Sequence, residues 1–276
     1  MKAGEMGRES FNNQVKPMAS DTVINLKQLK VACEDCRLSE ICLPKGLDQA
    51  EMVKLDDIVG RGHPLSKGEV LYHQGDSLQS IFAIHSGSLR SYTITQDGTE
   101  QTLGFYLPGE LVGLDGLEKS NHSCTTVALE TTSVCELPFN RLQTLCAALP
   151  SLQLQMMRLL GKELSDDHDI LLLLGTRSAE ERLAAFLLSL SKRFSERGFS
   201  ATEFNLSMSR HDISNFLGVA VETISRQFSN FDKEQILQVK HRNVKIIDLE
   251  KLQQIVSPCQ KSNNKSDKDS GLAAAQ

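Results

Sequence analysis

The sequence lacks the long apolar runs that membrane spans require. Although 40% of its 276 residues are hydrophobic, no run approaches the roughly 18 consecutive apolar residues of a transmembrane helix. Its start, MKAGEMGRESFNNQVK, also lacks the apolar stretch of a secretory signal. We therefore expect a globular protein of the cytoplasm that has no membrane partner.

The chain also lacks a positive charge excess. It has 30 Lys and Arg against 35 Asp and Glu, which gives a formal net charge of −5. This balance argues against a protein that is basic all over, but it is compatible with one locally basic, nucleic-acid-binding module. The length allows two domains, each with its own core.

Cysteine is scarce, yet three of the seven cysteines fall within CEDCRLSEIC, as Cys33, Cys36 and Cys42. In a chain that stays inside the cell, such spacing favours metal or redox work over disulfides. Three soft ligands are one short of a closed tetrahedral site, so a fourth must come from elsewhere. The spacing leaves open a Cys₄ zinc site. It also leaves open a Cys33–Cys36 redox dithiol, although the βαβ unit typical of that motif is lacking.

Residues from about 60 to 140 have the pattern of short β-strands. HPLSKGEVLYHQGD, SIFAIHSGSLRSYTIT and EQTLGFYLPGELVGL are rich in β-branched and aromatic residues and are punctuated by glycines. Asp97-Gly98 between two of them indicates a hairpin. Several short strands with regular turns predict an antiparallel barrel or roll.

Residues 150 to 175 change to helical periodicity, from Pro150 to Gly175. A helix of that length, ~37 Å, is too long to be covered by one small barrel. Its apolar residues alternate three and four apart, as in a coiled coil, with one acid among them. The resulting dimer seam is Met157, Leu160, Leu164, Asp167, Leu171 and Leu174. An amphipathic helix lying on the barrel is the alternative.

Residues 208 to 231, MSRHDISNFLGVAVETISRQFSNF, fit two helices joined by a tight turn at Gly218. Glu222, Ser225 and Arg226 lie three and four apart, so they share one exposed face of the second helix. Arg can bind guanine, Glu can accept from cytosine, and Ser can take either role. The following ILQVKHRNVKIID predicts a two-stranded wing that carries Lys240, His241, Arg242 and Lys245 and is suited to phosphate contact. A solvated face on an ordinary helical hairpin is the alternative.

A β-roll, a long helix and a winged helix-turn-helix in this order resemble the cyclic-AMP receptor protein superfamily. CEDCRLSEICLP, LETTSVCELPF, DILLLL followed by AEERLAAF, and VETISR most closely resemble the oxygen-responsive fumarate and nitrate reductase regulators, the FNR family. The resemblance covers about residues 25 to 250. It implies an α+β fold: an N-terminal antiparallel β-roll of the cyclic-nucleotide-binding type, a dimerisation helix and a C-terminal winged helix-turn-helix.

The expected domains follow from this resemblance and from composition. They are a flexible tail at 1–24, a cluster-binding segment and β-roll sensor at 25–149, a dimerisation helix at 150–175, a DNA-binding domain at 176–250 and a disordered tail at 257–276.

The resemblance also implies a cofactor, a [4Fe–4S] cluster held by cysteine thiolates. Cys33, Cys36 and Cys42 match the family's first three ligands, and Cys135 in LETTSVCELPF matches the fourth. With this resemblance, zinc becomes the lesser alternative.

The other cysteines have no counterpart among the family's ligands. Cys124 and Cys146 are expected to be small buried hydrophobes, with Cys124 the only rival to Cys135. Cys259 falls in the predicted C-terminal tail, where an exposed thiol without function is expected.

By resemblance, the protein is a transcription regulator and not an enzyme. The cluster-loaded homodimer would bind palindromic TTGAT-like sites in double-stranded DNA, activating or repressing anaerobic-respiration genes. Oxygen would convert the cluster to [2Fe–2S], loosening the dimer and lowering DNA affinity. A hairpin loop, residues 95 to 101 with Asp97 and Gly98, would contact RNA polymerase. This assignment rests wholly on resemblance, because the sequence of the loop is also that of an ordinary solvated turn.

A regulator gated by an organic effector or by haem in the β-roll is the rival interpretation.

No cyclic nucleotide is expected as a ligand. Nucleotide-binding members of the superfamily follow a Gly-Glu-Leu turn with an arginine and a small hydroxyl residue that grip the cyclic phosphate. Here Gly109, Glu110 and Leu111 are present, but no arginine occurs from 109 to 126. A buried phosphodiester without its charge-assisted partner would bind poorly.

Asp167 supplies a physical element for the expected switch. In a dimer, two Asp167 carboxylates would face each other across an interface of low dielectric constant, at a cost on the order of 1 to a few kcal/mol. Association would then be marginal, so that a change around the cluster could decide it. The alternative is that Asp167 faces solvent.

Overall fold

The computed structural model describes residues 32–256. The predicted tails at 1–24 and 257–276, with Cys259, lie outside the described residues, as do 25–31. Within the described part, none of the helices combines the length and apolar character needed to cross a bilayer.

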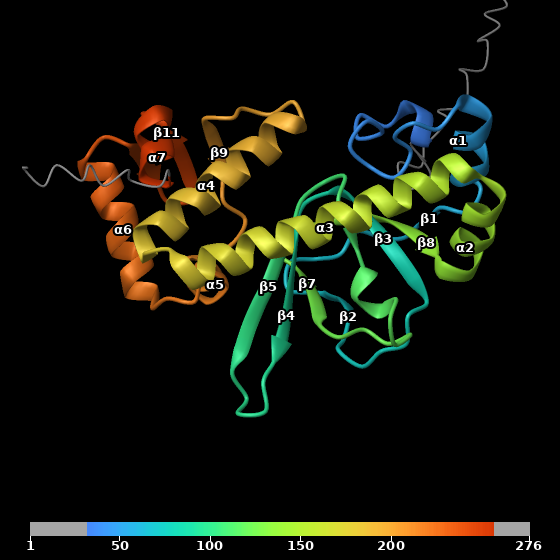
Figure 1. Cartoon of the computed structure of the whole chain (residues 1–276), viewed down its shortest axis with the longest axis horizontal. Coiled ribbons are helices and arrows are strands. Elements are labelled where there is room, and N and C mark those ends of the chain that lie inside the picture. The colour runs from blue at the N-terminus through green and yellow to red at the C-terminus, as the bar shows by residue number, and fades with distance from the viewer. Residues whose placement is uncertain (1–31, 257–276) are drawn as a thin grey trace, which may run out of the picture. The chain divides into compact units, whose positions relative to one another are not determined.

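Eight antiparallel strands form the β-roll (Figure 1). One sheet has the order β1-β8-β3-β6 and the other β2-β7-β4-β5. The predicted hairpin at Asp97-Gly98 joins β4 to β5. Tyr72, Ile84 and Leu89, from both sheets, are buried together in the core of the roll. The strands are β1 Gly60–Arg61, β2 Val70–Tyr72, β3 Ser80–Ser86, β4 Leu89–Ile94, β5 Glu100–Tyr106, β6 Leu111–Val112, β7 Thr125–Ala128 and β8 Ser133–Pro138.

A second apolar cluster joins the cysteine-containing loop to one end of the roll. It buries Leu43, Leu55, Leu137 and Leu152 among others. Helices α1 (Gln49–Asp56), α2 (Phe139–Ala148) and the start of α3 contribute to this cluster, which we call the loop core.

Helix α3 (Pro150–Thr176) is the predicted long helix, and it begins at a proline whose fixed φ suits a first helical position. Leu152 packs in the loop core at its start, whereas Ile170 and Leu173 pack against the core of the C-terminal helices. Helix α3 therefore contacts both halves of the described chain.

The C-terminal part is a winged helix-turn-helix, as predicted. Helix α4 precedes it, α5 and α6 form the two-helix unit, and β9 adds to the predicted wing a third strand in the order β10-β11-β9. The elements are α4 Ala179–Glu196, β9 Glu203–Asn205, α5 Arg210–Leu217, α6 Val221–Lys233, β10 Leu237–Lys240, β11 Asn243–Ile246 and α7 Leu249–Val256.

Gly87, between β3 and β4, is required by both conformation and space. Its φ is +82°, and a Cβ there would lie 2.5 Å from the Thr131 carbonyl oxygen and 2.7 Å from the Thr132 Cα. We expect Gly87→Ala to lower the free energy of unfolding by roughly 2–4 kcal/mol, measured by chemical denaturation. Gly98→Ala is the control, because its φ of +81° is similar but no atom lies within 4 Å. Equal losses would show that crowding at Gly87 is absent.

Candidate functional site

Three of the four cysteines singled out by the sequence lie at the loop core. Cys33 is buried in a short 3₁₀ turn, Cys33–Asp35, and Cys42 and Cys135 pack against the same apolar side chains. The thiols of Cys33 and Cys42 interact electrostatically with that of Cys135, as does the thiol of Cys36. A contiguous loop and a distant strand, β8, thus supply these thiols.

One charged pair lies beside these thiols. The Asp56 carboxylate accepts a hydrogen bond from the Cys33 amide at 3.1 Å and from Arg61 Nη2 at 2.6 Å. Burial alone would raise the pKa of Asp56, but the bonds and charge of Arg61 lower it below its usual value. Arg61 lies opposite Cys135 in the β1–β8 ladder, so it places a positive charge beside the thiols.

The thiols are poorly ionised by themselves. Burial raises the pKa of Cys33 to about 12, and the negative charge of Asp56 adds to this effect. Burial likewise raises the pKa of Cys42 to about 12 and raises that of Cys135. Thiolates are what metals bind, so a bound cation would have to supply the charge that keeps these sulfurs ionised.

The remaining described cysteines occupy different surroundings. Cys124 is buried in the core of the roll, and its thiol donates to Asp115 Oδ2 at 3.4 Å. Cys146, in α2, packs against the loop core, and burial alone raises the pKa of its thiol. Cys146 therefore packs against the same cluster as Cys135, whereas Cys124 does not. That Cys124 is the only rival to Cys135 as a ligand stays a prediction.

The predicted base-reading residues share an exposed face of α6. Glu222, Ser225 and Arg226 are all exposed, while Ile224 and Phe228 on the opposite side are buried. Ser225 Oγ donates to the Val221 carbonyl at 2.9 Å, which leaves its lone pairs free to accept. The face is therefore open to a DNA groove.

A side chain of α4 holds the turn between α5 and α6 in place. Gly218 ends α5 in the left-handed conformation, φ +63°, as the sequence predicted. Arg182 of α4 donates to the Leu217 carbonyl at 2.9 Å and also to the Leu174 carbonyl at 2.7 Å. One guanidinium thus connects the end of α3 to the turn that sets the direction of α6. Sequence reasoning did not identify Arg182.

The wing carries exposed basic residues near its tip. Lys240, His241 and Arg242 are exposed, as the phosphate-contact prediction requires. Lys245 differs, because its Nζ lies 3.8 Å from Glu203 of β9 in an ion pair. One of the residues predicted to contact phosphate is therefore already paired with an acid of the third strand.

The predicted dimer seam is uncovered in the single chain. Met157, Leu164 and Leu171 are 60%, 58% and 66% exposed, while Leu160 and Leu174 are half-buried. Asp167 is largely exposed between them, and partial burial beside the cavity, together with the neighbouring charge of Asp166, raises its pKa. An apolar stripe of this kind is what a partner helix covers.

Asp97 organises the hairpin loop that is predicted to contact RNA polymerase. Asp97 accepts hydrogen bonds from the Thr95 hydroxyl, the Thr99 amide and the Thr99 hydroxyl. Asp97 is thus exposed but already engaged within the turn.

The Gly-Glu-Leu turn is also engaged internally. Glu110 forms ion pairs with Arg193 of α4 at 2.5 Å and with Arg197, which directly follows α4, at 2.6 Å. Its carboxylate oxygens are thereby committed to α4. The expectation that no cyclic nucleotide binds stays a prediction.

Comparisons with known proteins agree with this architecture. The cyclic nucleotide-binding domain family matches residues 63–148, and the Crp-like helix-turn-helix domain family matches residues 181–255. FixK2 from Bradyrhizobium japonicum superimposes with a TM-score of 0.67 at 27% identity, over 73% of this chain and 98% of its own. These matches confirm the predicted fold class.

Curated relatives place the chain more finely. The transcriptional activator protein FnrA of Stutzerimonas stutzeri is 49% identical over 229 residues, which cover 83% of this chain and 94% of that protein. The fumarate and nitrate reduction regulatory protein of Escherichia coli is 47% identical over 225 residues, 82% of this chain and 90% of its own. With its β-roll, long helix and DNA-binding unit, the chain belongs to the FNR family of transcriptional regulators.

Proposed function

We propose that this regulator senses oxygen through a [4Fe–4S] cluster held by Cys33, Cys36, Cys42 and Cys135. The observation that carries the proposal is that Cys33, Cys42 and Cys135, from two distant segments, lie at the loop core, with the Cys36 thiol near enough to Cys135 to affect its pKa. When bound, the cluster supplies an oxygen-sensitive link between the cysteine-containing loop and β8.

One charged side chain beside the thiols fits the proposed cofactor. Within residues 32–256, no group of three His, Cys, Asp or Glu side chains is placed to hold a metal ion, so the choice of a cluster rests on the residue types and on the ligand pattern of the family. Arg61 would offset part of the negative charge of four thiolates.

The loop has a direct contact with the long helix. Gln155 of α3, only 4% exposed, donates to the Cys42 carbonyl at 3.3 Å. Ser151 of α3 donates to Glu51 of α1 at 2.5 Å. A change in the loop would therefore act on the first turns of α3, and through α3 on the dimer seam.

In this proposal the protein works in the cytoplasm as a homodimer formed through the dimer seam. It activates or represses anaerobic-respiration genes together with RNA polymerase, contacted at the loop containing Asp97 and Gly98. It binds palindromic TTGAT-like sites when the cluster is intact.

Base reading is assigned to Glu222, Ser225 and Arg226. We expect Glu222→Ala or Arg226→Ala to cost roughly 1–3 kcal/mol of binding free energy on a cognate duplex and little on a scrambled one. Fluorescence anisotropy at fixed salt would measure both. Equal losses on the two duplexes would instead assign these residues to general phosphate contact or packing.

Absorbance of protein purified without oxygen tests the sensing function. A broad band in the blue that fades in air, together with loss of binding to the cognate duplex, is the expected result. A sharp Soret band would point to haem, and a colourless protein that binds its site equally well in air would overturn the proposal.

A further inference from the structure

The position of the DNA-binding unit relative to the β-roll depends on non-covalent contacts. Helix α3 ends at Thr176 and α4 begins at Ala179, so two residues, Arg177 and Ser178, join them. This link does not by itself fix how the unit from α4 to α7 is oriented. That orientation depends on side chains that bridge the DNA-binding unit and the β-roll, and two groups of polar contacts form such bridges.

The first group joins α5 to the hairpin of β4 and β5. Asn215 of α5 donates to the Glu100 carbonyl at 2.5 Å and accepts from the Thr102 amide. From the opposite side, Gln101 Nε2 donates to the Asn215 carbonyl at 2.8 Å. Asn215 therefore pairs with the backbone of β5 much as another strand would.

A half-buried ion pair lies next to Asn215. Arg90 of β4 is 3.1 Å from the Asp212 carboxylate of α5 and 2.5 Å from that of Glu100. The side chains of Arg90 and Asp212 are only 11% and 16% exposed. Solvent and salt screen such a pair less than they screen a surface pair.

The second group joins α4 to the turn before β6. Glu110 binds Arg193 and Arg197, and the two guanidiniums donate further to the Phe105 and Pro108 carbonyls, each at 2.6 Å. Both arginines thus bind backbone carbonyls of the roll as well as the carboxylate of Glu110.

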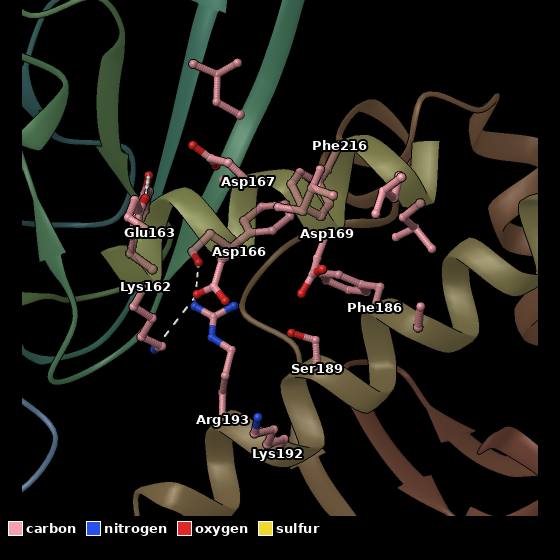
Figure 2. Close-up of a pocket in the computed structure, with 18 of the residues that line it drawn as sticks. Lys162, Glu163, Asp166, Asp167, Asp169, Phe186, Ser189, Lys192, Arg193 and Phe216 are labelled. Atoms are coloured by element: carbon pink, nitrogen blue, oxygen red, sulfur yellow. Dashed lines mark hydrogen bonds and ion pairs between the residues drawn. The ribbon is translucent and has the colours of Figure 1, made fainter. Parts of the chain in front are cut away.

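Close packing does not fix this arrangement on the α3 side. A cavity of about 610 Å³ separates α3 from α4 and β5. Figure 2 shows Arg193 extending from α4 toward α3, where Glu163 and Asp166 lie, with Phe186 and Phe216 along the cavity. Phe105 of β5 also packs against Phe186 and Phe216, so the polar contacts act together with this aromatic packing, and they supply the direction that apolar contacts lack.

Movement of α5 would also move the exposed face of α6 that carries Glu222, Ser225 and Arg226, which we call the reading face. Ile213 and Leu217 of α5 are fully buried against Ile224 and Phe231 of α6 in one core. The two helices therefore shift together, and the exposed face of α6 takes its direction from what holds α5.

We propose that Asn215, with Gln101 facing it, positions the DNA-reading helix by docking the DNA-binding unit on the sensor hairpin. Specific DNA binding then requires the docked arrangement, because two symmetry-related reading helices must meet half-sites about one helical turn apart. The apparent affinity falls in proportion to the docked fraction. This inference rests on the proposed DNA binding and concerns residues outside the reading face.

The test uses the full-length protein purified without oxygen. Asn215→Ala removes two hydrogen bonds at a half-buried position. We expect roughly tenfold weaker binding to a TTGAT-containing duplex, with little change on a scrambled one. Hydrogen exchange should become faster in β5, at the Thr102 amide, and in α5 together.

A second variant acts from the sensor side. Gln101→Ala leaves the whole DNA-binding unit unaltered, so any loss of specific affinity cannot come from damage to that unit. We expect a smaller loss, of a few-fold, with faster exchange in the same two segments. Asn140→Ala, the same substitution at an exposed position of α2, is the matched control. It should change neither the affinity for the TTGAT-containing duplex nor the rate of hydrogen exchange.

The outcomes separate docking from DNA binding itself. If Asn215→Ala speeds exchange but binds the duplex as the wild type does, docking does not govern recognition and the inference is overturned. Unchanged exchange with unchanged affinity would overturn it too, because the contact would then be absent in solution. If the wild type binds both duplexes equally, the proposed function fails first. Weaker specific binding by both variants, with faster exchange, supports the inference.

Discussion

Cys135→Ser protein purified without oxygen is expected to contain no bound iron or sulfide and to be colourless. The three thiols of the N-terminal loop would then lack the strand-borne partner that closes the site, and a serine hydroxyl is a poor substitute for a soft thiolate ligand. Binding to a cognate duplex should be lost with the cofactor. Iron and sulfide per monomer and the visible spectrum are the measurements, and single changes at Cys33, Cys36 or Cys42 should behave alike.

Two other cysteines provide the controls for that experiment. Cys124→Ser alters a thiol bonded to Asp115 in the core of the roll, and Cys146→Ser alters one that packs against the loop core. Both should retain iron and sulfide. A Cys135→Ser protein that still binds four irons, beside a Cys146→Ser protein that does not, would transfer the fourth ligand to α2.

Asp167→Ala should produce a protein that remains dimeric and active in air. The change removes two facing carboxylates from each dimer and leaves a small side chain of higher helix propensity between Leu164 and Leu171. A gain of ~1.4 kcal/mol already shifts a dimerisation constant tenfold. Sedimentation of the cluster-free protein in air should give the mass of a dimer where the wild type gives a monomer.

Asp169→Ala separates the dimer seam from general charge removal. Asp169 is an exposed acid of the same helix that lies outside the dimer seam, and it lines the cavity beside α4 as Asp167 also does. It should leave the cluster-free protein monomeric in air. If both variants dimerise, net charge governs association, and if neither does, Asp167 faces solvent in the assembled protein.

Local periodicity was enough to predict much of this molecule. The long helix was expected at 150–175 and is found at Pro150–Thr176. The heptad spacing also selected Met157, Leu164 and Leu171, which are indeed exposed. Gly218 was expected to form the turn before the reading helix and does so. These features depend on neighbours within a few residues, and such neighbours leave a repeating signal in the sequence.

Contacts between distant residues left no such signal. Glu110 and Arg193 are 83 positions apart, and Asn215 is 113 from Thr102. Isolated charges and amides have no period, so their pairing is decided by tertiary placement alone. The same holds for Arg61 beside Cys33. The short strand β9 was missed because three residues, Glu203–Asn205, are too few to show alternation.

The hydrophobic core at the DNA-binding end crosses the boundary between the two halves. Phe105, Leu107 and Leu129 of the β-roll are buried with Phe186 of α4 and Phe216 of α5, and the three aromatic rings lie 5.2–5.9 Å apart. Thermodynamically, the recognition unit is therefore not a separate cooperative module. Part of the free energy that keeps it folded comes from the sensor sheet, so weakening that edge lowers the melting temperature of the helices that read DNA.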